Sequence, residues 1–342
     1  MSRYLGVDLH RNCFTVCTQL ENGRQYMSTV KLENLQRFAS RLRADDEVAV
    51  EVTGNTRLFY DAVAPHVARV AVVNPFQFEV IRKSVKKTDE HDARALALFL
   101  SKDMLPEVRM KDQEHSEMAS LAQTRDTLVK SRTALKNKVN NLLSARGINL
   151  PKESLASEKG LREVLSLFFG STVDVELQVL VDQIRSLNQS IAKLEKAISE
   201  QAPKLPGYEN LTSIKGIGDV GASVLLSVIG DVNDFADEGK LASYFGIVPR
   251  VSNSNETQHT GRITKRGSKL GRTVLIQCAL IAKRYSEYLQ NFYERIKTKR
   301  GTGKAIVALA RKFLGIIYLT LKNNWIFEDF PNFILVDTEA PA

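Results

Sequence analysis

Four carboxylates lie where strands and helices can bring them together. Asp8 stands at the end of an apolar run in RYLGVDLHRN, and Glu51 lies in a second apolar run, EVAVEVTGN. Asp89 and Asp92 lie three residues apart at the start of a helical pattern, TDEHDARALALFL, so they share one face of that helix and repel each other. Clustered carboxylate oxygens suit Mg²⁺ or Mn²⁺, and such ions assist phosphodiester chemistry by neutralising phosphate charge. We therefore predict a Mg²⁺ (or Mn²⁺) site made of these four acids.

The two acids of the helix also allow a simpler interpretation. Asp89 follows Thr88, and a carboxylate in this position commonly caps a helix and interacts with its positive end. The metal hypothesis depends on Asp8 and Glu51 reaching the same edge of a sheet as the helix start.

The charge distribution predicts an anionic partner. The net charge is +9, and residues 250–312 contain 15 Lys or Arg against three acids. A concentration of positive charge of this kind is typical of proteins that bind nucleic acid.

The cysteines and the hydropathy indicate the compartment. Three cysteines are too few for a disulfide framework or a cysteine metal cluster, and neither a signal sequence nor a membrane-spanning run is recognisable. We expect a cytoplasmic protein without a membrane partner.

The order of apolar runs predicts the fold class, α/β plus α. Strands with interleaved helices, including an Asn22-Gly23 hairpin turn, indicate an α/β domain over residues 1–108. Heptad repeats then predict long helices at 113–146 and 173–200, within a coiled-coil region at 109–205. These two helices either form an antiparallel hairpin or dimerise with another chain.

The C-terminal part, residues 206–330 followed by a tail at 331–342, is expected to be mainly helical. Gly216 and Gly218 lie between two apolar helical stretches, which fits either a helix-hairpin-helix that binds phosphate or a plain turn between helices. Tyr244 and Trp325 are expected to lie in the core.

The motifs taken together resemble a known family. They are GVDLH, VEVTGN, VVNPFQ, KKTDEHDARALA, IKGIGDVGASVLLSVIGD, LASYFGIVPR and ITKRGSKLGRTVLIQCA, in this order from about residue 4 to 325. This series resembles the DEDD transposases of the insertion-sequence family known as IS one-ten and IS eleven-eleven, which includes pilin-gene invertases.

The resemblance implies a fold, a reaction and partners. The N-terminal domain is expected to be RuvC-like, an RNase H-type fold, with the acid tetrad at Asp8, Glu51, Asp89 and Asp92. A serine after the VPR motif is expected to cut and rejoin DNA through a covalent phosphoserine link. Double-stranded DNA, a bridge RNA that guides the enzyme, and further copies of the chain in a synaptic complex are the implied partners, at the nucleoid of a prokaryote.

Two serines that follow the VPR motif compete for the role of nucleophile. Ser254 matches the family position best, but Asn255 stands where family members usually have glycine, so Ser252 stays a competitor. Nearby cations could stabilise the charged phosphate during the reaction or could simply contact the DNA backbone. With Gly216 and Gly218, the candidate nucleic-acid-binding residues are Arg250, Arg262, Lys265, Arg266, Lys269 and Arg272.

Two other functions fit part of the pattern. A RuvC-like metal-dependent endonuclease would use water in place of the serine. A DNA-binding scaffold would bind with a steep salt dependence and no response to Mg²⁺, and the acid tetrad argues against it.

Overall fold

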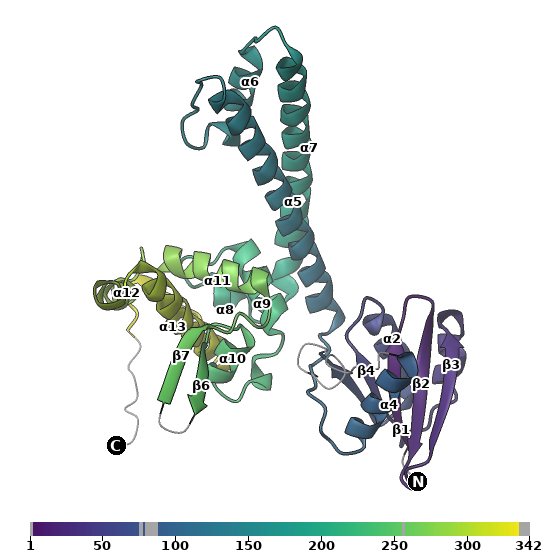
Figure 1. Ribbon diagram of the computed structural model, residues 1–342. Helices are drawn as coiled ribbons and strands as arrows, with labels where there is room; N and C mark the ends of the chain where they lie inside the picture. The colour runs from purple at the N-terminus through teal and green to yellow at the C-terminus, as the bar shows by residue number, and fades with distance from the viewer. Residues whose placement is uncertain (1–2, 75–77, 79–87, 255–256, 335–342) are drawn as a thin grey trace. The chain divides into compact units, whose positions relative to one another are not determined.

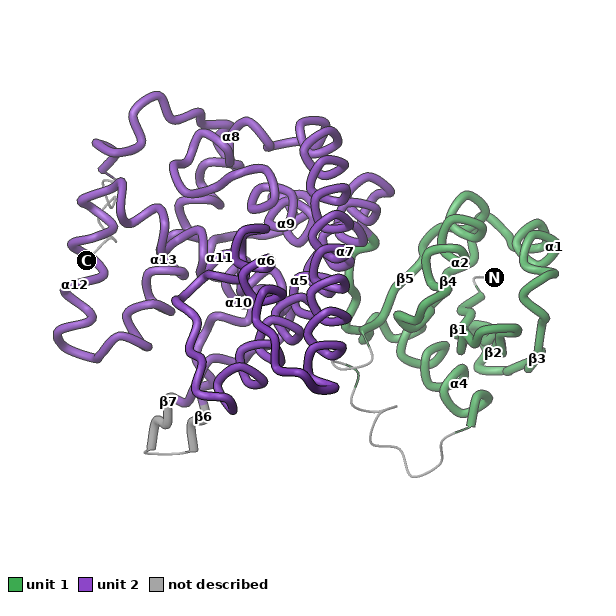
Figure 2. The backbone as a smooth tube through the Cα atoms, turned by 90° about the horizontal axis from the view of Figure 1, so that it is seen from above, with its two compact units in different colours: residues 1–110 green, residues 111–342 purple. Residues whose placement is uncertain are grey.

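The computed structural model describes residues 3–74, 78, 88–254 and 257–334, with side chains left undescribed between 252 and 260. The chain divides into two compact units, Met1–Met110 and Lys111–Ala342 (Figure 2). The N-terminal unit is mixed α/β and the C-terminal unit is mainly helical, which confirms the predicted fold class at this level. The division into three domains and a tail stays a prediction.

A five-stranded sheet forms the N-terminal unit, in the order β3-β2-β1-β4-β5 (Figure 1). Its strands are β1 (Arg3–Leu9), β2 (Cys13–Leu20), β3 (Gln25–Lys31), β4 (Glu47–Glu51) and β5 (Arg69–Val73). β2 is antiparallel to β1 and β3, whereas β4 is parallel to β1 and to β5. The predicted turn joins β2 to β3, and its Gly23 has a φ of +80°, which glycine adopts without steric cost.

The two faces of this sheet carry different helices, because successive side chains of a strand point to opposite sides. α1 (Leu35–Ala39) and α2 (Thr56–Val63) share one apolar core with alternate residues of β1, namely Leu5, Val7 and Leu9. The other face is covered by α4 (Asp89–Leu100), whose Leu96 and Leu100 pack with Ala49 of β4.

Two long helices dominate the first part of the C-terminal unit, α5 (Gln113–Ser144) and α7 (Thr172–Gln201) (Figure 1). They run antiparallel: Arg125 near the start of α5 binds Glu195 near the end of α7, and Lys138 binds Glu176 at 3.1 Å. Within one chain the heptad helices therefore form a hairpin, one of the two arrangements that the sequence allows.

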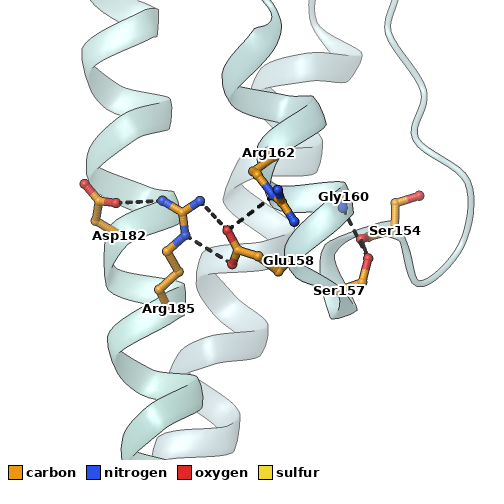
Figure 3. A network of polar contacts seen from close by, with 7 residues as sticks. All are labelled: Ser154, Ser157, Glu158, Gly160, Arg162, Asp182 and Arg185. Atoms are coloured by element: carbon orange, nitrogen blue, oxygen red, sulfur yellow. Dashed lines mark hydrogen bonds and ion pairs between the residues drawn. The ribbon is translucent and has the colours of Figure 1, made fainter.

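The tip of this hairpin is closed by α6 (Glu158–Ser166). Glu158 accepts from Arg185 at 2.6 Å, and Arg185 also contacts Asp182, which links α6 to α7 (Figure 3). Ser157 caps α6 by accepting from Gly160 N–H. Exposed ion pairs contribute little to stability, so the apolar cluster beneath them, around Leu161 and Leu177, holds the tip together.

The rest of the C-terminal unit is a helical domain with one small hairpin of strands. Its elements are α8 (Tyr208–Thr212), α9 (Asp219–Ile229), α10 (Glu238–Tyr244), β6 (Pro249–Ser254), β7 (Thr257–Ile263), α11 (Lys269–Ala282), α12 (Glu287–Arg300) and α13 (Thr302–Lys322). α13 contributes to the core of this domain, with Phe313 and Leu314 fully buried. Short 3₁₀ helices occur at Leu32–Asn34, Ala64–His66, Ser154–Ala156, Ala202–Lys204, Val232–Asp234 and Phe330–Asn332.

Two aromatic side chains of this unit are more exposed than the sequence predicted. Tyr244 and Trp325 are 42% and 39% exposed, so the prediction that both are core residues is wrong. Among the residues that the structure describes, every helix is too short or too polar to cross a membrane.

Candidate active site

The alternation of the strands places two of the predicted acids on the face that α4 covers. Asp8 lies two residues after Gly6 of β1, and Glu51 lies two residues after Ala49 of β4, so each shares a face with a residue packed against α4. β1 and β4 are parallel with Val7 opposite Val50. Extended by one residue beyond this last pair, the register would set Asp8 next to Glu51.

A compact turn holds the end of β4 and with it Glu51. The hydroxyl of Thr56 donates to the carbonyl of Glu51 at 2.8 Å and accepts from the N–H of Thr53 at 2.6 Å. Val52 N–H donates to the carbonyl of Val73 in β5. The VEVTGN motif therefore anchors the strand end beside Asp8.

Close packing of α4 brings the other two acids to the same place. A Cβ atom on Gly6 would overlap the backbone of Ala93 and Ala97, which shows that α4 lies directly on β1 and needs glycine at this contact. Thr88 caps the helix by accepting from the N–H of His91 at 3.2 Å. The cap is thus Thr88, and Asp89 is the first residue of the helix, free of the capping role that the sequence also allowed.

His10 is the site residue that sequence reasoning missed. Its Nε2 lies 3.2 Å from Oδ2 of Asp8 and 3.1 Å from Oδ2 of Asp89. The three ligand atoms of this group lie within 4.8 Å of one another. The only signal in the sequence was position: His10 follows two residues after Asp8 in GVDLH.

The electrostatics of the cluster favour a cation. Burial raises the pKa of the Asp8 carboxyl, His10 lowers it, and the nearby Asp89 and Asp92 raise it again, with a raised pKa as the result. Asp92 is thus close enough to Asp8 to act on its charge. A divalent ion would remove this repulsion, and the donor set of carboxylates with one imidazole fits such an ion.

The other predicted residues lie in the C-terminal unit, around the β6–β7 hairpin. Ser252 pairs with His259 and Ser254 with Thr257 in the backbone register, while the side chains of both serines lie outside the described residues. Arg250 and Arg262 are exposed on the two strands. Arg266 in the segment that leads into α11, and Lys269 at the first position of α11, are exposed as well, while Lys265 is half-buried.

Arg272 is placed differently from these exposed cations. Its Nη1 donates to the carbonyls of Phe245, Arg266 and Gly267 at 3.0–3.1 Å, and burial lowers its pKa. Gly246 and Gly267 have positive φ, and a Cβ on either would overlap the backbone of the opposite segment. Arg272 thus holds together the tight loops that present Arg266.

Comparison with known proteins places the chain in a family. A family described as Transposase IS116/IS110/IS902 matches residues 208–294, and a family described as Transposase matches residues 5–146, which include all four acids. The chain belongs to the IS110 family of transposases. The resemblance predicted from the motifs is confirmed, and this transposase is an enzyme that cleaves and rejoins DNA.

Similar proteins extend over nearly the whole transposase. The transposase for insertion sequence element IS1111A from Coxiella burnetii is 28% identical over 331 residues, 93% of this chain and 89% of that protein. The pilin gene-inverting protein of Moraxella bovis is 27% identical over 345 residues, 95% of this chain and 97% of that protein. The transposase for insertion sequence element IS1328 from Yersinia enterocolitica is 24% identical over 343 residues, 94% and 98% of the two chains.

The glycines of the predicted helix-hairpin-helix have separate surroundings in the transposase. Gly216 has a φ of +109° and packs against the backbone of Ala282 in α11, so packing alone explains this glycine. Gly218 precedes α9 and faces open space. Asp219 already places a carboxylate at this helix start, where it accepts from Ser199 and Tyr208. Phosphate binding by the two glycines stays a prediction.

Proposed function

We propose that this transposase cuts and rejoins DNA with a Mg²⁺- or Mn²⁺-dependent acid tetrad and a serine nucleophile. The tetrad is Asp8, Glu51, Asp89 and Asp92, and the nucleophile is Ser254, with Ser252 as its competitor. The observation that carries the proposal is that Asp8 and Asp89 both contact the imidazole of His10. Asp92 is close enough to Asp8 to raise its pKa.

The acids hold the ion, and the ion supplies charge neutralisation at the phosphate when it is bound. Asp8 and Glu51 come from adjacent parallel strands, so their separation is fixed by the sheet register. Asp89 and Asp92 come from the first turn of α4, whose position depends on the contact at Gly6. A site held by rigid elements in this way loses little entropy when phosphate binds.

The serine carries the covalent step. Its Oγ attacks phosphorus, the bond from phosphorus to the sugar oxygen breaks, and the sugar leaves as a hydroxyl that takes up a proton while Oγ loses one. Rejoining reverses the step: a sugar hydroxyl of the partner strand attacks the phosphoserine and releases Oγ. Arg250, Arg262 and Arg266, which are exposed, bind phosphate oxygens of the DNA strands.

The wider proposal concerns fold and assembly. The N-terminal unit is RuvC-like, supported by its mixed five-stranded sheet with acids at adjacent strand ends. The α5–α7 hairpin serves as a coiled-coil assembly element in a synaptic dimer or tetramer on double-stranded DNA at the nucleoid. A bridge RNA recognises the DNA sequence by base pairing, and the protein mainly binds the sugar-phosphate backbones of the nucleic acids.

Two alternatives keep metal-dependent cleavage of DNA but differ in the outcome or in the nucleophile. The pilin gene-inverting relatives favour inversion of a DNA segment as the outcome of the same strand exchange. A RuvC-like endonuclease would use water and leave no protein on the DNA.

A covalent-trapping experiment tests the proposal. The protein is incubated with Mg²⁺, the noncoding RNA of its element and labelled DNA that spans an element junction, and the products are separated under denaturing conditions. We expect a protein-linked DNA strand with wild type and Ser252→Ala, and none with Ser254→Ala or Asp8→Asn. Loss of the adduct only in Ser252→Ala would move the nucleophile, and cleavage without any adduct would make water the nucleophile.

A further inference from the structure

His10 occupies a position that the acid tetrad does not explain. Its Nε2 is 3.2 Å from Asp8 Oδ2 and 3.1 Å from Asp89 Oδ2. Two donor atoms that bind one ion side by side in an octahedral shell, with bonds of about 2.0–2.1 Å, are separated by roughly 3 Å. Both distances from Nε2 are close to this value. A single Nε2–H, by contrast, can point at only one of the two carboxylates.

The backbone of His10 is fixed from two sides. Its N–H donates to the carbonyl of Cys13 at 2.9 Å, which closes the turn between β1 and β2. Nδ2 of Asn55 donates to the carbonyls of His10 and Arg11 at 3.1 and 3.2 Å. Because Asn55 immediately precedes α2 and lies within the turn that holds Glu51, one segment positions both residues. The imidazole is thus presented to the carboxylates from a rigid turn.

We propose that His10 is a ligand of the metal ion, through Nε2, beside Asp8 and Asp89. This inference rests on the metal site of the proposed function and adds a nitrogen donor to it. Imidazole suits transition metals, whereas Mg²⁺ binds oxygen donors almost exclusively. The site therefore prefers Mn²⁺ to Mg²⁺, and the nitrogen ligand is the reason.

The chain offers a matched control for this ligand. His91 lies in the first turn of α4, two residues from Asp89, and is exposed as His10 is. Among the described residues it is not a member of the group formed by Asp8, His10 and Asp89. A change at His91 removes an imidazole from the same neighbourhood without removing the proposed ligand.

Mn²⁺ binding to the full chain, with any affinity tag removed, tests the inference. The free Mn²⁺ signal in EPR gives the affinity, and electron spin echo envelope modulation detects nitrogen bound to the ion. Wild type, His10→Ala, His10→Gln and His91→Ala are compared, with circular dichroism as the check of folding. Wild type and His91→Ala are expected to show nitrogen coupling. His10→Ala and His10→Gln are expected to lose it, with Mn²⁺ affinity lowered roughly 10–100-fold and Mg²⁺ affinity changed much less.

The possible results separate the two claims. Mn²⁺ binding without nitrogen coupling in wild type, or unchanged affinity in His10→Ala, overturns the role of His10 and leaves the acid site intact. Tight Mn²⁺ binding that is insensitive to both His10→Ala and Asp8→Asn, or no binding at all, overturns the metal site together with the inference.

Discussion

Replacing Gly6 by alanine is expected to push α4 away from the sheet and to separate the acids of the site. A methyl group on Gly6 would overlap the carbonyl oxygen of Ala93 and the amide nitrogen of Ala97, and would lie 2.9 Å from Cβ of Leu96. Two of these three atoms belong to the helix backbone, so a change of rotamer cannot relieve the overlap. The helix has to move as a body.

The size of the movement follows from these contacts. Ordinary contact for a Cβ begins at 3.4 Å, so Leu96 has to retreat by at least 0.5 Å and the two backbone atoms by more. Overpacking of this kind costs about 1–3 kcal/mol of the free energy of unfolding. Since a misplacement of about 1 Å can lower a rate by about 10²-fold, strand cleavage is expected to fall by at least that factor.

Urea unfolding and a DNA cleavage assay measure the two effects. Gly54→Ala in the same unit is the matched control, because a Cβ on Gly54 meets nothing within 4 Å. We expect that variant to unfold within about 0.5 kcal/mol of wild type. If Gly6→Ala also stayed within that range and cleaved DNA at the wild-type rate, the helix contact would not position the acids and the reasoning would be refuted.

Three further changes are expected to have distinct effects. Asp8→Asn is expected to raise the thermal midpoint of the metal-free protein, because burial and the neighbouring acids disfavour the charged form of Asp8 and so raise its pKa. The same change is expected to abolish cleavage. Hydrogen bonds from Ser199 and Tyr208 lower the pKa of Asp219. The contribution of Asp219 to stability is therefore present above about pH 4 and is lost as the pH falls through the lowered pKa. Tyr208→Phe is expected to reduce this loss of unfolding free energy at acid pH, as measured by urea unfolding. Arg272→Ala is expected to cost about 2–3 kcal/mol of unfolding free energy, since three carbonyls lose a charged donor.

Each of these changes has a control or a contrary result. Asp61→Asn removes an exposed carboxylate from a surface pair with Arg57 and should leave the thermal midpoint unchanged; a lower midpoint in Asp8→Asn would contradict the buried-charge explanation. If Tyr208→Phe lost as much unfolding free energy at acid pH as wild type, the hydrogen bond from Tyr208 would not be a cause of the lowered pKa of Asp219. Arg266→Ala should weaken DNA binding and reduce its salt slope by about 1 without loss of stability, the opposite of Arg272→Ala.

The sequence predicted the elements that carry the acids, because strand and helix periodicity are local signals. Asp8 and Glu51 end apolar runs, and Asp89 starts a helix, so their positions at element ends could be read directly. Their convergence could not be calculated in the same way. It depends on the parallel register of β1 and β4 and on the backbone contact at Gly6.

Features that depend on distant contacts were missed. His10 reaches the site because Asn55, 45 residues away, holds its turn. The β6–β7 hairpin was not predicted, since its strands are rich in polar residues and lack an alternating apolar pattern. From the sequence, Arg272 was predicted to bind phosphate like the cations near it. In the structure its guanidinium instead donates to backbone carbonyls of the tight loops at Gly246 and Gly267.

The most direct test of the central claim is metal-dependent DNA strand cleavage by wild type and by four single variants, Asp8→Asn, Glu51→Gln, Asp89→Asn and Asp92→Asn. If the four carboxylates form one metal site, wild type cleaves with Mg²⁺ or Mn²⁺ and not with EDTA, and every variant loses cleavage while it stays folded. A wild-type rate in any of the variants, or cleavage that persists in EDTA, would contradict the account.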